Sequence, residues 1–104
     1  MTGDEEVKLV GESARGAHAS RLLADEVFVE AFETVEKWII DSWKESPIRD
    51  TEGQLDLRLM HKVLIRVRKH IEEVVQTGKM ANQQLEHERS LKERARAAVR
   101  EFRR

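Results

Sequence analysis

The spacing of apolar residues between positions 26 and 45 is the feature that most restricts how this chain can fold. In the stretch EVFVEAFETVEKWIIDSWKE, the apolar side chains recur at intervals of three and four residues. They are Phe28, Ala31, Phe32, Val35, Trp38, Ile39 and Trp43. This interval matches one face of an α-helix, whereas a half-buried strand would alternate every second residue. Asp25, just before the run, is a preferred N-cap residue and is expected to begin the helix.

A second helix is predicted over residues 51–77, after a break at SPIRDTEG. Pro47 disfavours helical backbone at Ser46, and Asp50 is suited to cap the helix that follows. The apolar residues of this helix then follow a spacing close to the heptad repeat of a coiled coil. They are Leu57, Met60, Leu64, Val67, Ile71, Val74 and Val75. Because the connection is short, we expect helices 26–45 and 51–77 to form an antiparallel hairpin.

The remaining segments complete the prediction of an all-α chain with three regions. Residues 1–12 are predicted to be an acidic mobile arm, and residues 13–78 the hairpin core with a short leading segment that Gly16 interrupts. Residues 79–104 are predicted to form a basic C-terminal helix. Its apolar stripe consists of Leu85, Leu91, Ala95, Ala98 and Phe102. Gly78 is suited to end the second helix, but the pattern also allows that helix to continue through it.

The helix over residues 26–45 has a wider apolar surface than one partner helix can cover. Its apolar arc spans roughly 160° of the helical wheel, and Val29 and Ile40 extend it past roughly 200°. We therefore expect the chain to oligomerise, or to bind a partner protein, through this surface. The interface residues we predict are Phe28, Phe32, Val35, Trp38, Ile39 and Trp43. The alternative is that the N-terminal and C-terminal segments fold back and cover the same surface.

Charge is distributed very unevenly along the chain, although its net charge is only −1. Residues 1–56 have 14 acidic and 6 basic side chains, and residues 57–104 have 6 acidic and 13 basic ones. An acidic row on the first hairpin helix contains Glu26, Glu30 and Glu33. A basic row on the second contains Arg58, Lys62, Arg66 and Lys69. We expect these rows to meet across the hairpin or between subunits, where they would set orientation more than stability.

The basic C-terminal helix is the main candidate for binding a charged partner. Its basic stripe consists of Arg89, Lys92, Arg96, Arg100 and Arg103. Three interpretations remain: a strap that docks on an acidic protein surface, a helix that contacts nucleic-acid phosphates without reading sequence, or a solvated helix face. The apolar stripe beside the basic one also needs a cover, and the acidic N-terminal half offers opposite charge. Both observations favour the strap.

The sequence predicts no enzyme activity, catalytic residue, metal site or cofactor. The chain has no cysteine, which excludes disulfides and thiolate chemistry. Its four histidines are His18, His61, His70 and His87, and none follows an Asp, Glu or His by three or four residues, the usual spacing of helical metal ligands. The start MTGDEEVKLV is acidic and unlike a secretory signal, and no apolar run is long enough to span a membrane.

Several features between residues 21 and 81 resemble small helical proteins from the head and DNA-packaging gene blocks of tailed phages and gene-transfer agents. These features are the LLAD entry, the aromatic helix that ends in SW, the SP…D turn and the TGKMA exit. The resemblance implies a role in virion assembly or DNA packaging, similar to that of a small terminase subunit. It also implies an oligomer, a phage structural or packaging partner, and a location in the host cytoplasm or the virion. The N-terminal helix-turn-helix that is usual in small terminases is absent from this sequence.

Overall fold

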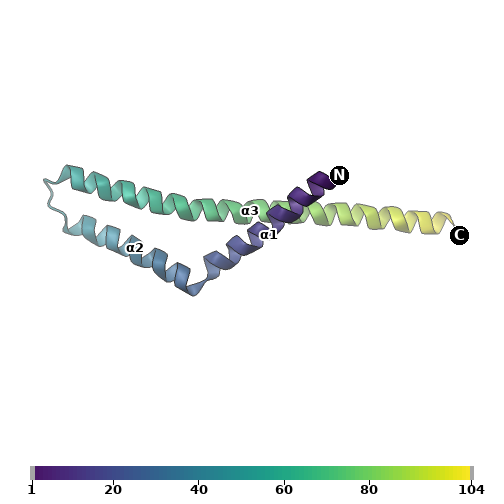
Figure 1. Cartoon of the computed structure of the whole chain (residues 1–104), viewed down its shortest axis with the longest axis horizontal. Helices are drawn as coiled ribbons and strands as arrows, with labels where there is room; N and C mark the ends of the chain where they lie inside the picture. The colour runs from purple at the N-terminus through teal and green to yellow at the C-terminus, as the bar shows by residue number, and fades with distance from the viewer. Residues whose placement is uncertain (1, 104) are drawn as a thin grey trace. The chain divides into compact units, whose positions relative to one another are not determined.

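The computed structural model of the chain describes residues 2–103 and contains three helices (Figure 1). Helix α1 spans Gly3–Ala24, α2 spans Glu26–Glu45 and α3 spans Thr51–Phe102. No strand occurs among residues 2–103, so the predicted all-α class is confirmed. The chain divides into two compact units. The central unit is Ala19–Glu73, and the terminal unit combines the described residues up to His18 with those from Val74 onward.

Helix α2 begins and ends where the sequence predicts. The Asp25 side chain accepts a hydrogen bond of 2.9 Å from the backbone N–H of Phe28, which satisfies one of the free donors at the helix start. At the other end, Ser46 has extended backbone angles (φ −67°, ψ 142°), the conformation imposed on a residue before proline. The Ser46 hydroxyl donates to the carbonyl of Trp43.

The turn into α3 also follows the sequence prediction. The Asp50 carboxylate accepts a hydrogen bond of 2.9 Å from the backbone N–H of Gly53, so Asp50 caps α3. The Gln54 amide donates to the carbonyl of Pro47, and the backbone N–H of Asp50 donates to the same carbonyl. These bonds tie the first turn of α3 and its cap residue Asp50 back to Pro47.

Most of the region predicted to be an acidic mobile arm, residues 1–12, is helical in the structure. Helix α1 already begins at Gly3, because Thr2 and Glu5 form a reciprocal capping box. The Glu5 N–H donates to the Thr2 hydroxyl, and the Thr2 N–H donates to the Glu5 carboxylate. The first turn is also acidic, with Asp4, Glu5 and Glu6, which the helix dipole favours. Residue 1 lies outside the described part of the chain.

At residue 78, where the sequence allowed either a helix end or a continuous helix, the structure has a continuous helix. No separate helix begins at residue 79, because α3 is one helix of 52 residues from Thr51 to Phe102. Gly78 does not adopt the left-handed conformation of a helix-ending glycine, since no glycine in residues 2–103 has positive φ. Gly16 likewise lies inside α1 and does not interrupt it.

In the terminal unit, Gly16 and Gly78 are the point where the backbones of α1 and α3 touch. Both glycines are buried. A Cβ atom added to Gly16 would lie 2.6 Å from the Cα of Gly78, and one added to Gly78 would lie 2.5 Å from the Cα of Gly16. A Cβ on Gly78 would also lie 3.0 Å from the carbonyl oxygen of Glu12. Only glycine allows so close an approach of two backbones. This explains why α1 and α3 each contain a glycine here, although glycine disfavours a helix interior.

The central unit has a small apolar core where α2 contacts α3. Ile39 is 3% exposed and Phe32 is 9% exposed. The guanidinium of Arg68 lies over the ring of Phe32, with 5.2 Å between its central carbon and the ring centroid, a cation–π distance. Leu57, Leu64 and Ile71 on α3 are half-buried. The core therefore occupies a single line of contact between the two helices.

Candidate protein interaction surface

The structure separates the six predicted interface residues of α2 into two groups. Phe32 and Ile39 are buried and Phe28 is half-buried, so these three belong to the core of the central unit. Val35, Trp38 and Trp43 remain exposed, with exposed fractions of 44%, 56% and 53%. Sequence periodicity could not make this distinction, because both groups lie within one broad apolar arc.

An exposed apolar strip runs along one flank of α2. It consists of Val27, Ala31, Val35 and Trp38. At about 100° per residue, Val27, Ala31 and Trp38 lie roughly 80–140° around the helix from the buried residues Phe32 and Ile39, and Val35 lies roughly 40–60° from them. The strip is therefore separate from the α2–α3 contact and faces solvent in the central unit.

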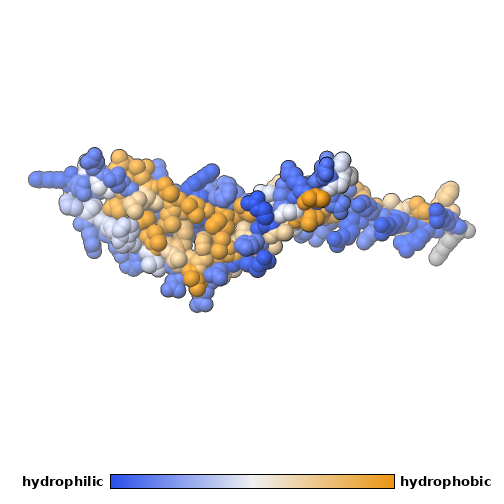
Figure 2. Space-filling view, viewed as in Figure 1, coloured by the Kyte–Doolittle hydropathy of each residue, from blue (hydrophilic) through white to orange (hydrophobic). Residues whose placement is uncertain are grey.

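A similar exposed strip runs along α3 within the central unit. It consists of Met60, Val63 and Val67. Around the helix, Val63 lies roughly 100–120° from Leu57 and Leu64, and Met60 and Val67 lie roughly 40–80° from them, all in the same rotational sense as the α2 strip. Figure 2 shows apolar side chains gathered over α2 and the part of α3 beside it. Exposed apolar patches of this kind mark binding surfaces more often than chance.

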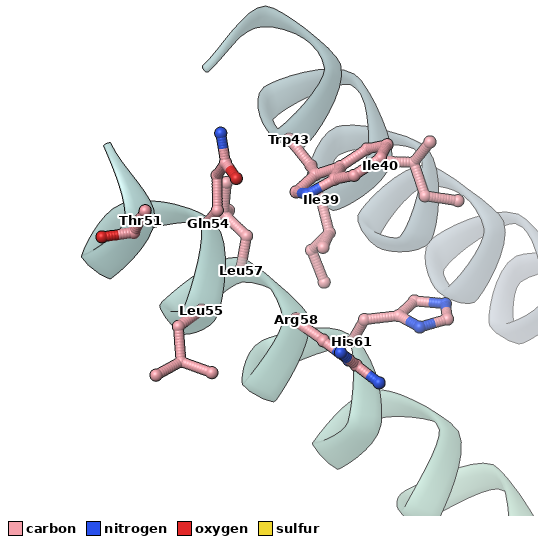
Figure 3. A pocket seen from close by; sticks show the side chains of 9 residues that line it. All are labelled: Ile39, Ile40, Trp43, Thr51, Gln54, Leu55, Leu57, Arg58 and His61. Carbon is pink, nitrogen blue, oxygen red and sulfur yellow. The ribbon is translucent and has the colours of Figure 1, made fainter. Parts of the chain in front are cut away.

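An open groove lies on the central unit near the turn between α2 and α3 (Figure 3). Its volume is about 570 Å³. The α2 side is formed by Ile39, Ile40 and Trp43. The α3 side is formed by Thr51, Gln54, Leu55, Leu57, Arg58 and His61. The lining is mostly apolar, with Arg58 and His61 as its titratable residues.

The His61 imidazole lies at the inner end of this groove and reaches across to α2. Its Nε2 atom is 3.1 Å from a carboxylate oxygen of Glu36, and both side chains are about one third exposed. The pair joins residues that are 25 positions apart in the sequence. Sequence reasoning did not find this pair, because spacing patterns reveal only contacts between residues three or four positions apart on one helix. His70, by contrast, is exposed.

The two charge rows predicted to meet across the helices form no ion pair with each other within residues 2–103. Glu26, Glu30 and Glu33 have no ion-pair partner among these residues. The ion pairs near them are local, such as Lys37 with Asp41 on α2. The Lys37 ammonium also donates a hydrogen bond to the Asp41 carboxylate, and this bond raises the pKa of Lys37 and lowers the pKa of Asp41. Much of the acidic surface of α2 therefore stays available to another molecule.

The predicted basic stripe lies on an exposed part of α3. Arg89, Lys92, Arg96, Arg100 and Arg103 are all exposed. None of them forms an ion pair with any residue between 2 and 103. Phe102, on the adjacent apolar stripe, is 93% exposed. The stripe of charge and the stripe of apolar residues thus lie side by side without a cover in the terminal unit.

Comparisons with known proteins add no relative: no protein-family model matches the chain, and no characterised protein or solved structure does either. Within residues 2–103, no group of three His, Cys, Asp or Glu side chains is arranged to hold a metal ion. None of the helices in this part of the chain is both long and apolar enough to cross a membrane.

Proposed function

We propose that this protein is a non-enzymatic helical assembly protein that associates with itself through the exposed apolar face of its central unit. The apolar face is the α2 strip (Val27, Ala31, Val35, Trp38) together with the α3 strip (Met60, Val63, Val67). The observation that supports the proposal most directly is the exposure of Trp38 beside Val35 on a helix whose inner side is already packed. Tryptophan is among the residues most enriched at the centres of protein interfaces.

In this proposal α2 and the first half of α3 act as an antiparallel hairpin. The support is the order of their contacts: Glu36 meets His61, and the earlier residue Phe32 meets the later residue Arg68. The apolar strips of α2 and α3 are rotated from the contact line by similar angles in the same sense. Equal rotations fall on the same side of an antiparallel pair, so the two strips form one continuous face.

The small size of the core explains why this face needs a cover. Among residues 2–103, the buried apolar side chains are Ala19, Phe32, Ile39 and Ala81. Each further Å² of apolar surface that is removed from water contributes roughly 25 cal/mol. Association of the apolar faces of two or more copies would supply the burial that a single chain of 104 residues lacks here.

We further propose that the biological setting is phage virion assembly or DNA packaging. The support for this is the resemblance of residues 21–81 to small helical proteins of phage head and packaging gene blocks. A self-associating helical protein that binds a packaging or structural partner fits such a role. The proposed location is accordingly the host cytoplasm or the virion.

Replacing Trp38 by glutamate should weaken self-association about 30-fold or more, because a buried interface tryptophan typically contributes about 2 kcal/mol or more. The measurement is molar mass by light scattering over a range of protein concentrations. Trp43→Glu is the matched control, since Trp43 has nearly the same exposed fraction but lines the groove instead of the apolar face. A wild-type protein that stays at its chain mass of 12.1 kDa at every concentration would refute the proposal.

The alternative function is nucleic-acid binding by the basic stripe, which is favoured by the exposure of its five side chains without ion pairs in residues 2–103. Five phosphate contacts would give a plot of log affinity against log salt concentration with a slope of about −4 to −5. Titration of a labelled DNA duplex with the protein, monitored by fluorescence anisotropy at several salt concentrations, tests this. A flat anisotropy signal at low salt would eliminate the alternative.

A further inference from the structure

We propose that the apolar face of the central unit is covered by the C-terminal segment of a second copy of this chain. The C-terminal segment is defined as residues 89–103, the last part of α3 in the described structure. This inference rests on the self-association proposed above and adds the identity, direction and register of the occupant. It is supported by three properties of the segment: its exposed apolar stripe, the position of its basic stripe, and the continuity of α3.

The exposed apolar stripe gives the segment a reason to bind. Leu91, Ala95, Ala98 and Phe102 recur at intervals of three and four residues and are all exposed. Leu91 and Phe102 are 11 positions apart, which corresponds to about 17 Å along a helix. Val27 and Trp38 on α2 are also 11 positions apart. The two apolar strips therefore match in length.

The charged residues beside the two strips give the direction of binding. On the C-terminal segment, Lys92, Arg96 and Arg103 each follow an apolar stripe residue by one position. On α2, Glu26 and Glu30 each precede an apolar strip residue by one position. One position is a rotation of about 100°, so the basic and acidic residues lie on opposite rotational sides of their own strips. When the C-terminal segment and α2 face each other through their apolar strips, the basic residues of one therefore meet the acidic residues of the other only if the two helices run parallel.

An antiparallel arrangement would place the basic stripe over the outer flank of α3. That flank contains Lys62 and Arg66, each one position before a residue of the α3 strip. Like charges in this position would oppose binding. In the parallel arrangement, a register with Leu91 at Val27 places Arg89 near Glu26 and Lys92 near Glu30. Lys37, one position before Trp38, also lies on this flank of α2, where it pairs with Asp41. Charge thus selects the direction, while apolar burial provides most of the affinity.

The occupant comes from another copy because α3 is continuous from Thr51 to Phe102. Residues 60–67, which form part of the apolar face, and residues 91–102 belong to this one helix. An unbroken helix cannot lie alongside itself. A contact between the C-terminal segment of one copy and the central unit of the next is heterologous, so repeated contacts produce a closed ring or a filament.

Engineered disulfides test the occupant and its direction together, and the absence of cysteine from the natural sequence makes the assay free of background thiols. One copy carries Leu91→Cys. A second copy, distinguished by a mass tag, carries either Val27→Cys or Ser42→Cys. Parallel binding brings position 91 near position 27 and leaves it roughly 18 Å or more from position 42 along α2, too far for a disulfide. After mild oxidation, the proportion of tagged heterodimer is measured by non-reducing electrophoresis and mass spectrometry.

The expected result is a heterodimer with Val27→Cys at a yield at least tenfold above that with Ser42→Cys. The reverse ratio would overturn the inferred direction. If neither pair cross-links while light scattering still shows an oligomer that depends on Trp38, the C-terminal segment is not the occupant, although self-association stands. Absence of cross-links together with binding of labelled DNA would assign the basic stripe to nucleic acid and also overturn the inference. A monomeric wild type would refute the proposed function as well.

Discussion

Alanine at Gly16 should lower the free energy of unfolding by about 1–3 kcal/mol, the usual cost of inserting a methyl group into a contact that cannot expand. Alanine at Gly11, five residues earlier in the same helix, should instead raise it by about 0.5–1 kcal/mol. Both changes remove a glycine from the interior of α1 and improve helix propensity equally. The two changes in the free energy of unfolding therefore differ in sign only because the added methyl group has room at Gly11 and none at Gly16.

The surroundings of the two glycines explain this contrast. A Cβ on Gly16 would lie 2.6 Å from the Cα of Gly78 and 3.2 Å from the carbonyl oxygen of Val74, and both are backbone atoms that cannot rotate away. A Cβ on Gly11 would meet nothing within 4 Å. The clash at Gly16 must therefore be relieved by separating α1 from α3.

Urea denaturation followed by circular dichroism, at one fixed protein concentration, measures both free-energy changes. Hydrogen exchange adds a local test: in Gly16→Ala, amides of residues 3–18 should exchange faster, because α1 loses its packing in the terminal unit. Gly78→Ala should behave like Gly16→Ala, since it places a methyl group in the same contact from the other side. Stabilisation by Gly16→Ala would show that the close approach of α1 and α3 does not exist in solution.

Truncating Ile39 to alanine should destabilise the protein by about 2–5 kcal/mol, the range for removing a buried isoleucine side chain beyond Cβ. Ile39 is 3% exposed and is one of the few buried side chains of the central unit. In a core that occupies one line of contact, neighbouring residues can fill little of the resulting space. The loss should appear as a lower denaturation midpoint with an unchanged denaturant dependence.

Ile40→Ala is the matched control for this truncation. It removes the same atoms one position along α2, but Ile40 is 38% exposed. The expected loss is about 1 kcal/mol, because part of the side chain already contacts water. Equal losses at the two positions would mean that the inner side of α2 is not the one that packs on α3.

Much of the local structure follows from short-range sequence signals. The bounds of α2 at Glu26 and Glu45 could be predicted because Asp25, Ser46 and Pro47 act on neighbouring backbone atoms. The start of α3 at Thr51 follows from Asp50 in the same way. The capping box of Thr2 and Glu5 is also a local signal, and attention to its T-x-x-E spacing would have placed the start of α1 at Gly3.

The candidate interaction surface could be predicted only in outline. The sequence placed Phe32 and Trp38 on one broad apolar arc, yet the first is buried and the second is exposed. Which part of an arc faces a neighbouring helix depends on the rotation of both helices about their axes. That rotation is set by packing between residues distant in sequence, such as Phe32 with Arg68 and Glu36 with His61.

The sequence by itself determined that this chain is helical, where α2 begins and ends, and that acidic and basic residues are concentrated in different halves. These properties depend on interactions within one or two helical turns and on composition. The tertiary structure decided what Gly16 and Gly78 do: two residues that locally favour a break instead allow two continuous helices to touch. The physical reason is that a glycine looks the same in sequence whether it supplies conformational freedom or the space of a missing side chain, and only the position of the opposing backbone distinguishes the two.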